Sequence, residues 1–327
     1  MKVAKDIYKG LNIQNCMQKS VIILTILILI AVVSCAPSGR EEGPVDYRYG
    51  TQGLRINFEP NLPPYRLFDT EPFHAVVAVE NMGTFTVGGP GDKIYLSGFD
   101  PTILTGISTY GAQIPRLEGR GPYTPVGDID FTEFRGTIRA LAQKRIEKYP
   151  ATLLATACYG YETIASAQVC IDPNPFAPGA RESVCIPQNV ALGGGQGAPV
   201  AVTLVEVDPS PGRTRFRISI QNVGAGEVFR QGVQYLDKCS PYTPPLAFDE
   251  IEYIQIADVQ ISGVSIRPSC KPLDETSHLR LTNGQGTIFC EFTQIRGQTA
   301  YTTPITIILR YGYRTSVATN IEIQPIS

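Results

Sequence analysis

Apolar and polar residues alternate along most of this chain, in short segments separated by glycine and proline turns. Alternation with a period of two is typical of β-strands that bury one face. The pattern predicts strands at 54–58, 74–80, 94–99, 129–140, 152–161 and 164–171, and again at 200–207, 215–221, 252–262, 279–281, 287–292, 305–313 and 317–323. About seven strands in about 120 residues predict a β-sandwich in each half of the chain.

Two segments in the predicted strands repeat each other. Residues 149–171 and 301–323 share the core Tyr-Gly-Tyr-x-Thr, with β-branched and small residues on both sides. We interpret each segment as a strand, a tight turn near Thr163 or Thr315, and a returning strand.

A second pair of segments supports the duplication. Residues 74–87 and 216–229 each contain a strand that ends in Asn-x-Gly, at 81–83 and 222–224, before a further apolar run. Two shorter matches fall in the same order in both halves. Collinear matches of this kind indicate a duplicated domain.

The chain is therefore predicted to be all-β, with two tandem sandwiches of the immunoglobulin-like type at 53–172 and 199–327. Residues 173–198 are rich in proline and glycine, which predicts a linker or loop. Residues 35–52 are interpreted as a flexible tether and residues 1–34 as a signal peptide.

The strand–Asn-x-Gly–strand pattern resembles the immunoglobulin-like, CARDB-like domains that are common on archaeal and bacterial surfaces. The resemblance covers both predicted domains. Unlike antibody domains, the chain has no tryptophan, and so it lacks their Cys…Trp…Cys spacing. The resemblance implies extracellular scaffolding or adhesion, and it carries no catalytic residue.

The N-terminal region contains an export signal. Residues 21–33 are apolar at all but one position and precede a cysteine. Val32, Val33, Ser34 and Cys35 resemble the lipobox of exported lipoproteins, in which the cysteine is lipidated and becomes the first residue of the mature chain. The apolar run would span about 20 Å as a helix, which is short for a membrane core of about 30 Å.

An uncleaved anchor and an ordinary signal peptide are the alternatives to lipidation at Cys35. Starting translation at Met17 would give a signal of ordinary length and would exclude Cys16 from the protein. In each case the chain is expected to be extracytoplasmic and, if lipidated or uncleaved, attached to a membrane through its N-terminus.

Charge and composition narrow the possible partners. The net charge is −2 and no basic stretch follows the signal, so nucleic acid is not an expected partner. The expected partner is an unknown protein or glycan. The glycine-rich segment 88–93 lacks the Gly-Lys-Ser/Thr ending of a phosphate-binding loop and is predicted to be a turn.

Six cysteines follow the lipobox: Cys158, Cys170, Cys185, Cys239, Cys270 and Cys290. An even number in an exported chain suggests three disulfides, although fifteen pairings are possible. Proximity favours 170–185 and 270–290, each closing a loop of about 15–20 residues, and leaves 158 with 239. The spacings do not match those of zinc sites.

No pattern in the sequence predicts a catalytic or metal site. His74 begins a strand and His278 lies in a polar loop, and neither matches a known catalytic motif. Asp128, Asp130 and the acidic run 249–252 supply fewer oxygens than a calcium site requires. We expect solvated loop charges, no cofactor and no enzymatic activity.

Tyr159 and Tyr161 in the first repeat, and Tyr311 and Tyr313 in the second, are two positions apart, so each pair shares one face of a strand. They are expected to pack in the core and hydrogen-bond a neighbouring loop. The alternative is an exposed aromatic strip that binds glycans or a protein.

The leading hypothesis is a lipid-anchored cell-surface protein with a non-enzymatic role in adhesion, envelope structure or binding. One alternative is a carbohydrate-binding or solute-capture lipoprotein. Another is a set of accessory domains from an extracytoplasmic hydrolase.

Overall fold

The computed structural model describes residues 47–141, 147–176, 184–295, 297 and 299–326. These residues are almost all in β-strands and connecting loops, with a short α-helix, α2 (Val233–Lys238), and a 3-10 turn, η2 (Arg267–Ser269). The predicted all-β class is confirmed. The predicted signal peptide, residues 1–34, lies outside the described residues.

Each half of the chain contributes one four-stranded antiparallel sheet. The first has the order β1 (Leu54–Phe58), β3 (Pro72–Asn81), β7 (Ile129–Ile138), β5 (Leu104–Thr105). The second has the order β16 (Gln285–Phe292), β11 (Arg213–Asn222), β10 (Val200–Ser210), β9 (Val190–Ala191).

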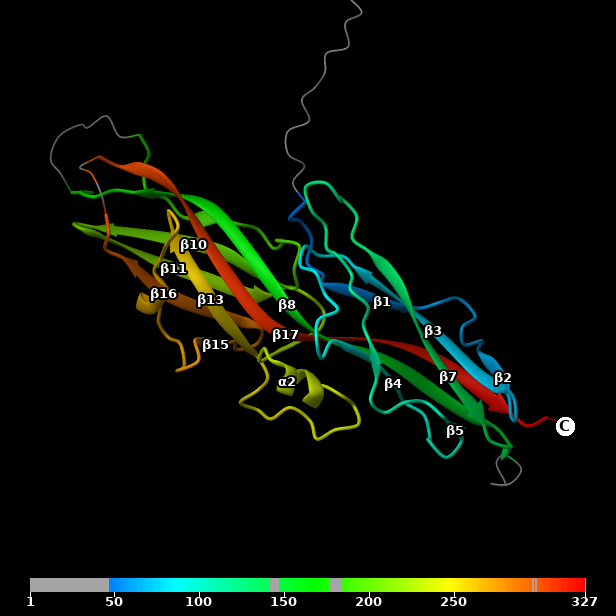
Figure 1. The fold of residues 1–327 in the computed structure, drawn as a ribbon. Helices are drawn as coiled ribbons and strands as arrows, with labels where there is room; N and C mark the ends of the chain where they lie inside the picture. Colours follow the sequence, from blue (N-terminus) through cyan, green and yellow to red (C-terminus); the bar gives the residue numbers. More distant parts are fainter. Residues whose placement is uncertain (1–46, 142–146, 177–183, 296, 298, 327) are drawn as a thin grey trace, which may run out of the picture. The chain divides into compact units, whose positions relative to one another are not determined.

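A nine-stranded sheet is shared by both halves (Figure 1). Its main path is β14 (Val264–Ser265), β13 (Tyr253–Ile261), β17 (Tyr301–Gln324), β8 (Tyr149–Ile171), β4 (Lys93–Ser97), β6 (Ala112–Gln113). Three further strands attach to this path: β2 (Arg66–Phe68), β12 (Glu227–Phe229) and β15 (His278–Arg280).

The long strands β8 and β17 connect the two halves. They pair antiparallel without a register shift, from Tyr149 opposite Ile323 to Ile171 opposite Tyr301. β4 pairs with the first part of β8, whereas β13 pairs with the first part of β17. Each strand therefore begins in the sandwich of its own repeat and ends in the sandwich of the other.

The tight turns predicted near Thr163 and Thr315 are wrong. Both residues lie inside continuous strands, and the predicted pairs 152–161 with 164–171 and 305–313 with 317–323 each form a single strand. The Thr163 hydroxyl donates to Val200 O at 2.7 Å in the core. A ladder partner from the other repeat is available along the whole length, so the chain has no need to turn back.

Alternating side chains of these strands fill the core between the sheets. The inward residues of β8 and β17 are the buried ones: Leu153, Ala155, Ala157, Tyr159, Tyr161, Ala165, Val169, Ile305, Ile307, Leu309, Tyr311, Tyr313, Ile321 and Ile323. The core is thus one continuous apolar cluster that extends through both halves.

Two segments pack more closely than predicted. Residues 47–52, assigned to the flexible tether, are held against two loops. The Arg120 guanidinium donates to Tyr49 O and lies 4.0 Å from the Tyr49 ring, and Gly197 N donates to Gly50 O. Part of the segment 173–198 is also structural. Its residues 190–191 form β9, and Ala198 is completely buried.

Candidate functional site

The four tyrosines of the repeated segments lie in the hydrophobic core. Their exposed fractions are 0% for Tyr159, 2% for Tyr161, 0% for Tyr311 and 3% for Tyr313. The rings form one cluster, with centroids 5.9 Å apart within the first pair and 6.3 Å apart between Tyr161 and Tyr311. The exposed aromatic strip is therefore wrong, because these rings have almost no access to solvent.

The first tyrosine of each pair holds the first strand of its own repeat. The Tyr159 hydroxyl accepts a hydrogen bond from Leu54 N at 3.0 Å, and the Tyr311 hydroxyl accepts one from Val200 N at 3.2 Å. Burial raises the pKa of both phenols well above the usual value. Both hydroxyls therefore stay neutral and stabilise backbone groups that lie in the core.

The second tyrosine of each pair holds the turn that follows Asn-x-Gly. The Tyr161 hydroxyl accepts from Phe85 N at 3.3 Å, and the Tyr313 hydroxyl accepts from Gly226 N at 2.8 Å. Burial raises the pKa of Tyr313 to about 12. The Asn-x-Gly turn and the second tyrosine of Tyr-Gly-Tyr thus form one hydrogen-bonded unit in each repeat. We call this unit the corner.

The residues of Asn-x-Gly complete this corner. Asn81 and Asn222 each donate through Nδ2 to the carbonyl four residues ahead, at 2.7 and 2.9 Å. A Cβ added to Gly83 would lie 1.8 Å from the tyrosine hydroxyl, and one added to Gly224 would lie 2.3 Å from it. Only glycine allows the hydroxyl to approach this closely.

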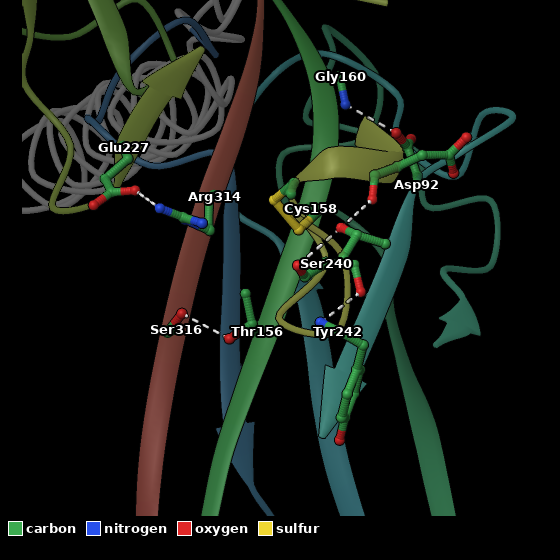
Figure 2. The surroundings of a disulfide bond; sticks show 12 residues. Asp92, Thr156, Cys158, Gly160, Glu227, Ser240, Tyr242, Arg314 and Ser316 are labelled. Carbon is green, nitrogen blue, oxygen red and sulfur yellow. Dashed lines mark hydrogen bonds and ion pairs between the residues drawn. A yellow bond between two sulfur atoms is a disulfide. The ribbon is translucent and has the colours of Figure 1, made fainter. Parts of the chain in front are cut away.

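The two corners differ in the space beside them. Next to the first is a cavity of about 260 Å³, and the Phe85 side chain forms part of its wall. Next to the second is a cavity of about 490 Å³, where Gly226 occupies the equivalent position. Glu227 and Arg314 form an ion pair in the wall of the larger cavity (Figure 2).

An insertion of the second repeat covers the outer face of the shared sheet. It contains α2 and is attached to β8 by the Cys158–Cys239 disulfide (Figure 2). Leu236 of α2 packs with both sulfurs, Tyr95 and Phe229 in a second, smaller apolar cluster. The Tyr242 hydroxyl donates to the backbone carbonyl of β4 at Leu96.

Asp92 binds the backbone of β8 just beyond the last residue of β4 that pairs with this strand. Its Oδ1 accepts from Gly160 N at 2.8 Å, and its Oδ2 accepts from Gly88 N at 2.9 Å and Gly89 N at 2.8 Å. Burial raises the pKa of this carboxyl above its usual value, against the effect of the three N–H donors. The segment 88–93 is therefore a turn, as predicted, and it wraps around its own carboxylate.

The predicted disulfides are confirmed in all three pairs. Besides the pair at Cys158, Cys170 is bonded to Cys185 and Cys270 to Cys290. Disulfides form and persist in oxidising, extracytoplasmic compartments.

The two histidines lie in different structural settings. His74 Nε2 is 3.4 Å from Glu133 on the exposed face of the first sheet. His278 is buried, its Nδ1 is 2.8 Å from Thr276 Oγ1, and its burial lowers its pKa. Asp274 accepts hydrogen bonds from the backbone around it, which makes this loop a structural turn.

The remaining acidic candidates are separate from each other and bind backbone or lysine. Asp128 accepts from Glu118 N, and Asp130 from Phe131 N. In the run 249–252, Glu250 pairs with Lys238. Within the described residues no group of three histidine, cysteine or carboxylate side chains could hold a metal ion.

The proposed lipidation residue, Cys35, lies outside the described residues. In the part of the chain that is described, no helix is both long and apolar enough to cross a membrane. Neither a protein-family model nor a curated protein matches this chain.

Proposed function

We propose that this chain is a lipid-anchored cell-surface protein with a non-enzymatic role in adhesion or envelope structure. The lipobox at Cys35 supplies the anchor, and the three disulfides suit an oxidising exterior. The body that follows would act as a stiff element that holds its surface at a distance from the membrane.

The observation that carries this proposal is the sheet shared by the two repeats. Most tandem domains move relative to each other because a flexible linker connects them. Here β8 and β17 stay paired from one sandwich into the other, and Cys158–Cys239 links the repeats covalently. Bending between the halves would break ladder hydrogen bonds in the core, so the unit transmits force without a hinge.

The anchor is tested by replacing Cys35 with alanine. We expect Cys35→Ala to leave the membrane fraction or to remain as an uncleaved precursor, because the lipidation site is lost. Cys16→Ala is the matched control and should fractionate like the wild type. Intact mass before and after lipase treatment measures the lipid, and an unchanged mass and distribution for Cys35→Ala would contradict the proposal.

The adhesive or structural role is tested on cells that carry either version at equal levels. Anchored protein should increase attachment between cells or resistance of the envelope to osmotic shock. Cells in which Cys35→Ala is released from the membrane should show neither effect. Equal attachment and equal envelope resistance in the two strains would contradict the proposed role.

A further inference from the structure

The larger cavity lies at a position of the corner where the two repeats differ. In the first repeat, the Phe85 ring packs edge-on against Tyr161, with centroids 5.6 Å apart. In the second repeat this position is Gly226, which has no ring to place beside Tyr313. The space of about 490 Å³ next to Gly226 is within the range of about 300–1,000 Å³ for small-molecule sites.

One wall of this cavity is aliphatic. Val228 and Leu281 come from the core side, and Leu246 comes from the insertion that follows α2. Val228 and Leu281 are almost fully buried, whereas Leu246 is half-buried. An apolar surface of this kind can cover the C–H face of a small ring.

The rest of the lining is mostly polar and carries both signs of charge. Glu227 and Arg314 are paired to each other, and Glu252 and Asn283 lie at the cavity as well. Glu252 Oε1 accepts from Gly284 N at 3.3 Å, and its Oε2 has no partner among the described residues. Acceptors and donors are therefore close together at one surface.

The backbone at Glu252 is unusual for its residue type. Its φ is 58°, a left-handed conformation that is unfavourable for glutamate by about 1 kcal/mol or more. It is held there because Glu252 N donates to Val228 O at 2.8 Å and Leu281 N donates to Glu252 O at 2.7 Å. Such outliers are frequent at active sites and ligand sites, and Glu252 is part of the lining of the cavity.

The lining selects for a neutral ligand with several hydroxyl groups. A hydroxyl both donates and accepts, so it can bind to a carboxylate, a guanidinium and an amide in turn. An anion would face two carboxylates, and the paired Glu227 and Arg314 offer acceptors and donors with no net charge between them. We propose that the cavity beside Gly226 binds a neutral saccharide unit, with its ring against Leu246 and Leu281 and its hydroxyls on Glu227, Glu252 and Arg314.

This inference goes beyond the proposed scaffold role, because an anchored, rigid body needs no ligand. The experiments can contradict either proposal without contradicting the other. Loss of saccharide binding leaves membrane fractionation unchanged, and loss of the lipid leaves the cavity intact.

The test uses the full-length chain in detergent on an array of immobilised neutral mono- and disaccharides, with amino and carboxylated sugars alongside. Binding of at least one neutral sugar is expected, in the millimolar to micromolar range of about −4 to −8 kcal/mol. The double variant Glu227→Gln/Arg314→Gln should bind about tenfold more weakly or worse, since hydrogen bonds to charged groups are lost. Leu246→Trp, which fills the cavity from the exposed insertion, should abolish binding.

The matched control is Glu162→Gln/Arg310→Gln. This pair joins β8 to β17 at 2.7 Å, whereas Glu227 and Arg314 join β12 to β17, and it lines the smaller cavity. Its removal should therefore leave saccharide affinity unchanged. Thermal unfolding followed by circular dichroism confirms that each variant is folded. The proposal is overturned if no neutral sugar binds, if only charged sugars bind, or if the control pair reduces binding while Leu246→Trp does not.

Discussion

The two glycines at the centre of β8 and β17 are direct partners in the ladder, yet their surroundings differ. Gly160 and Gly312 face each other in register. Beside Gly160 lies the Asp92 carboxylate, and a Cβ added to Gly160 would lie 3.9 Å from its Oδ1, an ordinary contact distance. Above Gly312 lies the Phe229 ring, only 2.1 Å from where a Cβ would be. The same motif therefore needs glycine for sterics in one repeat only.

The covering layer explains this difference. By the alignment of the Asn-x-Gly segments, the position of Phe229 in the second repeat is occupied by Gly88 in the first. Gly88 N donates to Asp92, whereas Phe229 pairs with Gly312 as part of β12. The hydrogen bonds of the corner are the same in both repeats, because they satisfy buried backbone groups, while the residues packed over the corner differ.

The largest effect should come from the disulfide that crosses between the repeats. Cys158→Ala/Cys239→Ala opens a loop of 81 residues and Cys170→Ala/Cys185→Ala one of 15 residues. In the chain-entropy model these losses are about 4.5 and about 3 kcal/mol of unfolding free energy. Denaturant titration of both variants measures the difference, and a larger loss for the shorter loop would contradict it.

Gly312→Ala should destabilise the protein by about 3 kcal/mol, because its Cβ would overlap the buried Phe229 ring. Gly160→Ala, its partner across the ladder, should change stability by no more than about 0.5 kcal/mol. Adding Phe229→Leu to Gly312→Ala should recover part of the loss if the ring is the cause. Equal losses for the two glycines would show that they are needed for the backbone and not for the space above it.

Much of the fold could be predicted because the recurring residues perform fixed local tasks. The Asn-x-Gly and Tyr-Gly-Tyr segments can be recognised in the sequence because they make the same hydrogen bonds to the backbone in both repeats. Strand β1 was predicted with its observed bounds from alternation alone. Two disulfides can be predicted from an even number of cysteines and short loops, and the third follows by elimination.

The rest depended on contacts between distant segments. A strand that continues past Thr163 and one that turns there have the same β-branched pattern, and only the partner from the other repeat decides between them. Helix α2 has six residues, too few for a helical period to show. Nothing in the sequence distinguishes Asp92 from other polar residues near glycine turns. The difference between Phe85 and Gly226 can be interpreted only when the structure places both residues beside a tyrosine.

Asp92→Asn should destabilise the protein by about 2 kcal/mol near neutral pH, because an amide NH₂ would face N–H donors that the carboxylate now binds. The folded pKa of Asp92 is raised above 3.8, so the folded state binds its proton more tightly than the unfolded chain. The stabilisation from this proton is complete below pH 3.8 and is lost as the pH rises through the folded pKa.

The difference in unfolding free energy between wild type and Asp92→Asn should therefore shrink as the pH rises from about 3.8. Denaturant titrations at several pH values between about 3 and 7 measure this difference. Asp130→Asn, on an exposed part of β7, is the control. A difference that grows with pH would mean that the three N–H donors outweigh the burial of Asp92.

The smallest effect should distinguish the two corners by their hydroxyl groups. Tyr161→Phe leaves Phe85 N without its acceptor, and Tyr313→Phe does the same to Gly226 N. An unsatisfied donor of this kind destabilises a protein by about 1 kcal/mol or more. At Gly226, however, the adjoining cavity of about 490 Å³ gives water access to the orphaned N–H.

We expect a loss of about 1 kcal/mol for Tyr161→Phe and roughly half of that for Tyr313→Phe. Denaturant titration of the two variants measures both losses. If Tyr313→Phe proves the more damaging, the second corner is closed to water, and the cavity beside it is not open to a ligand either.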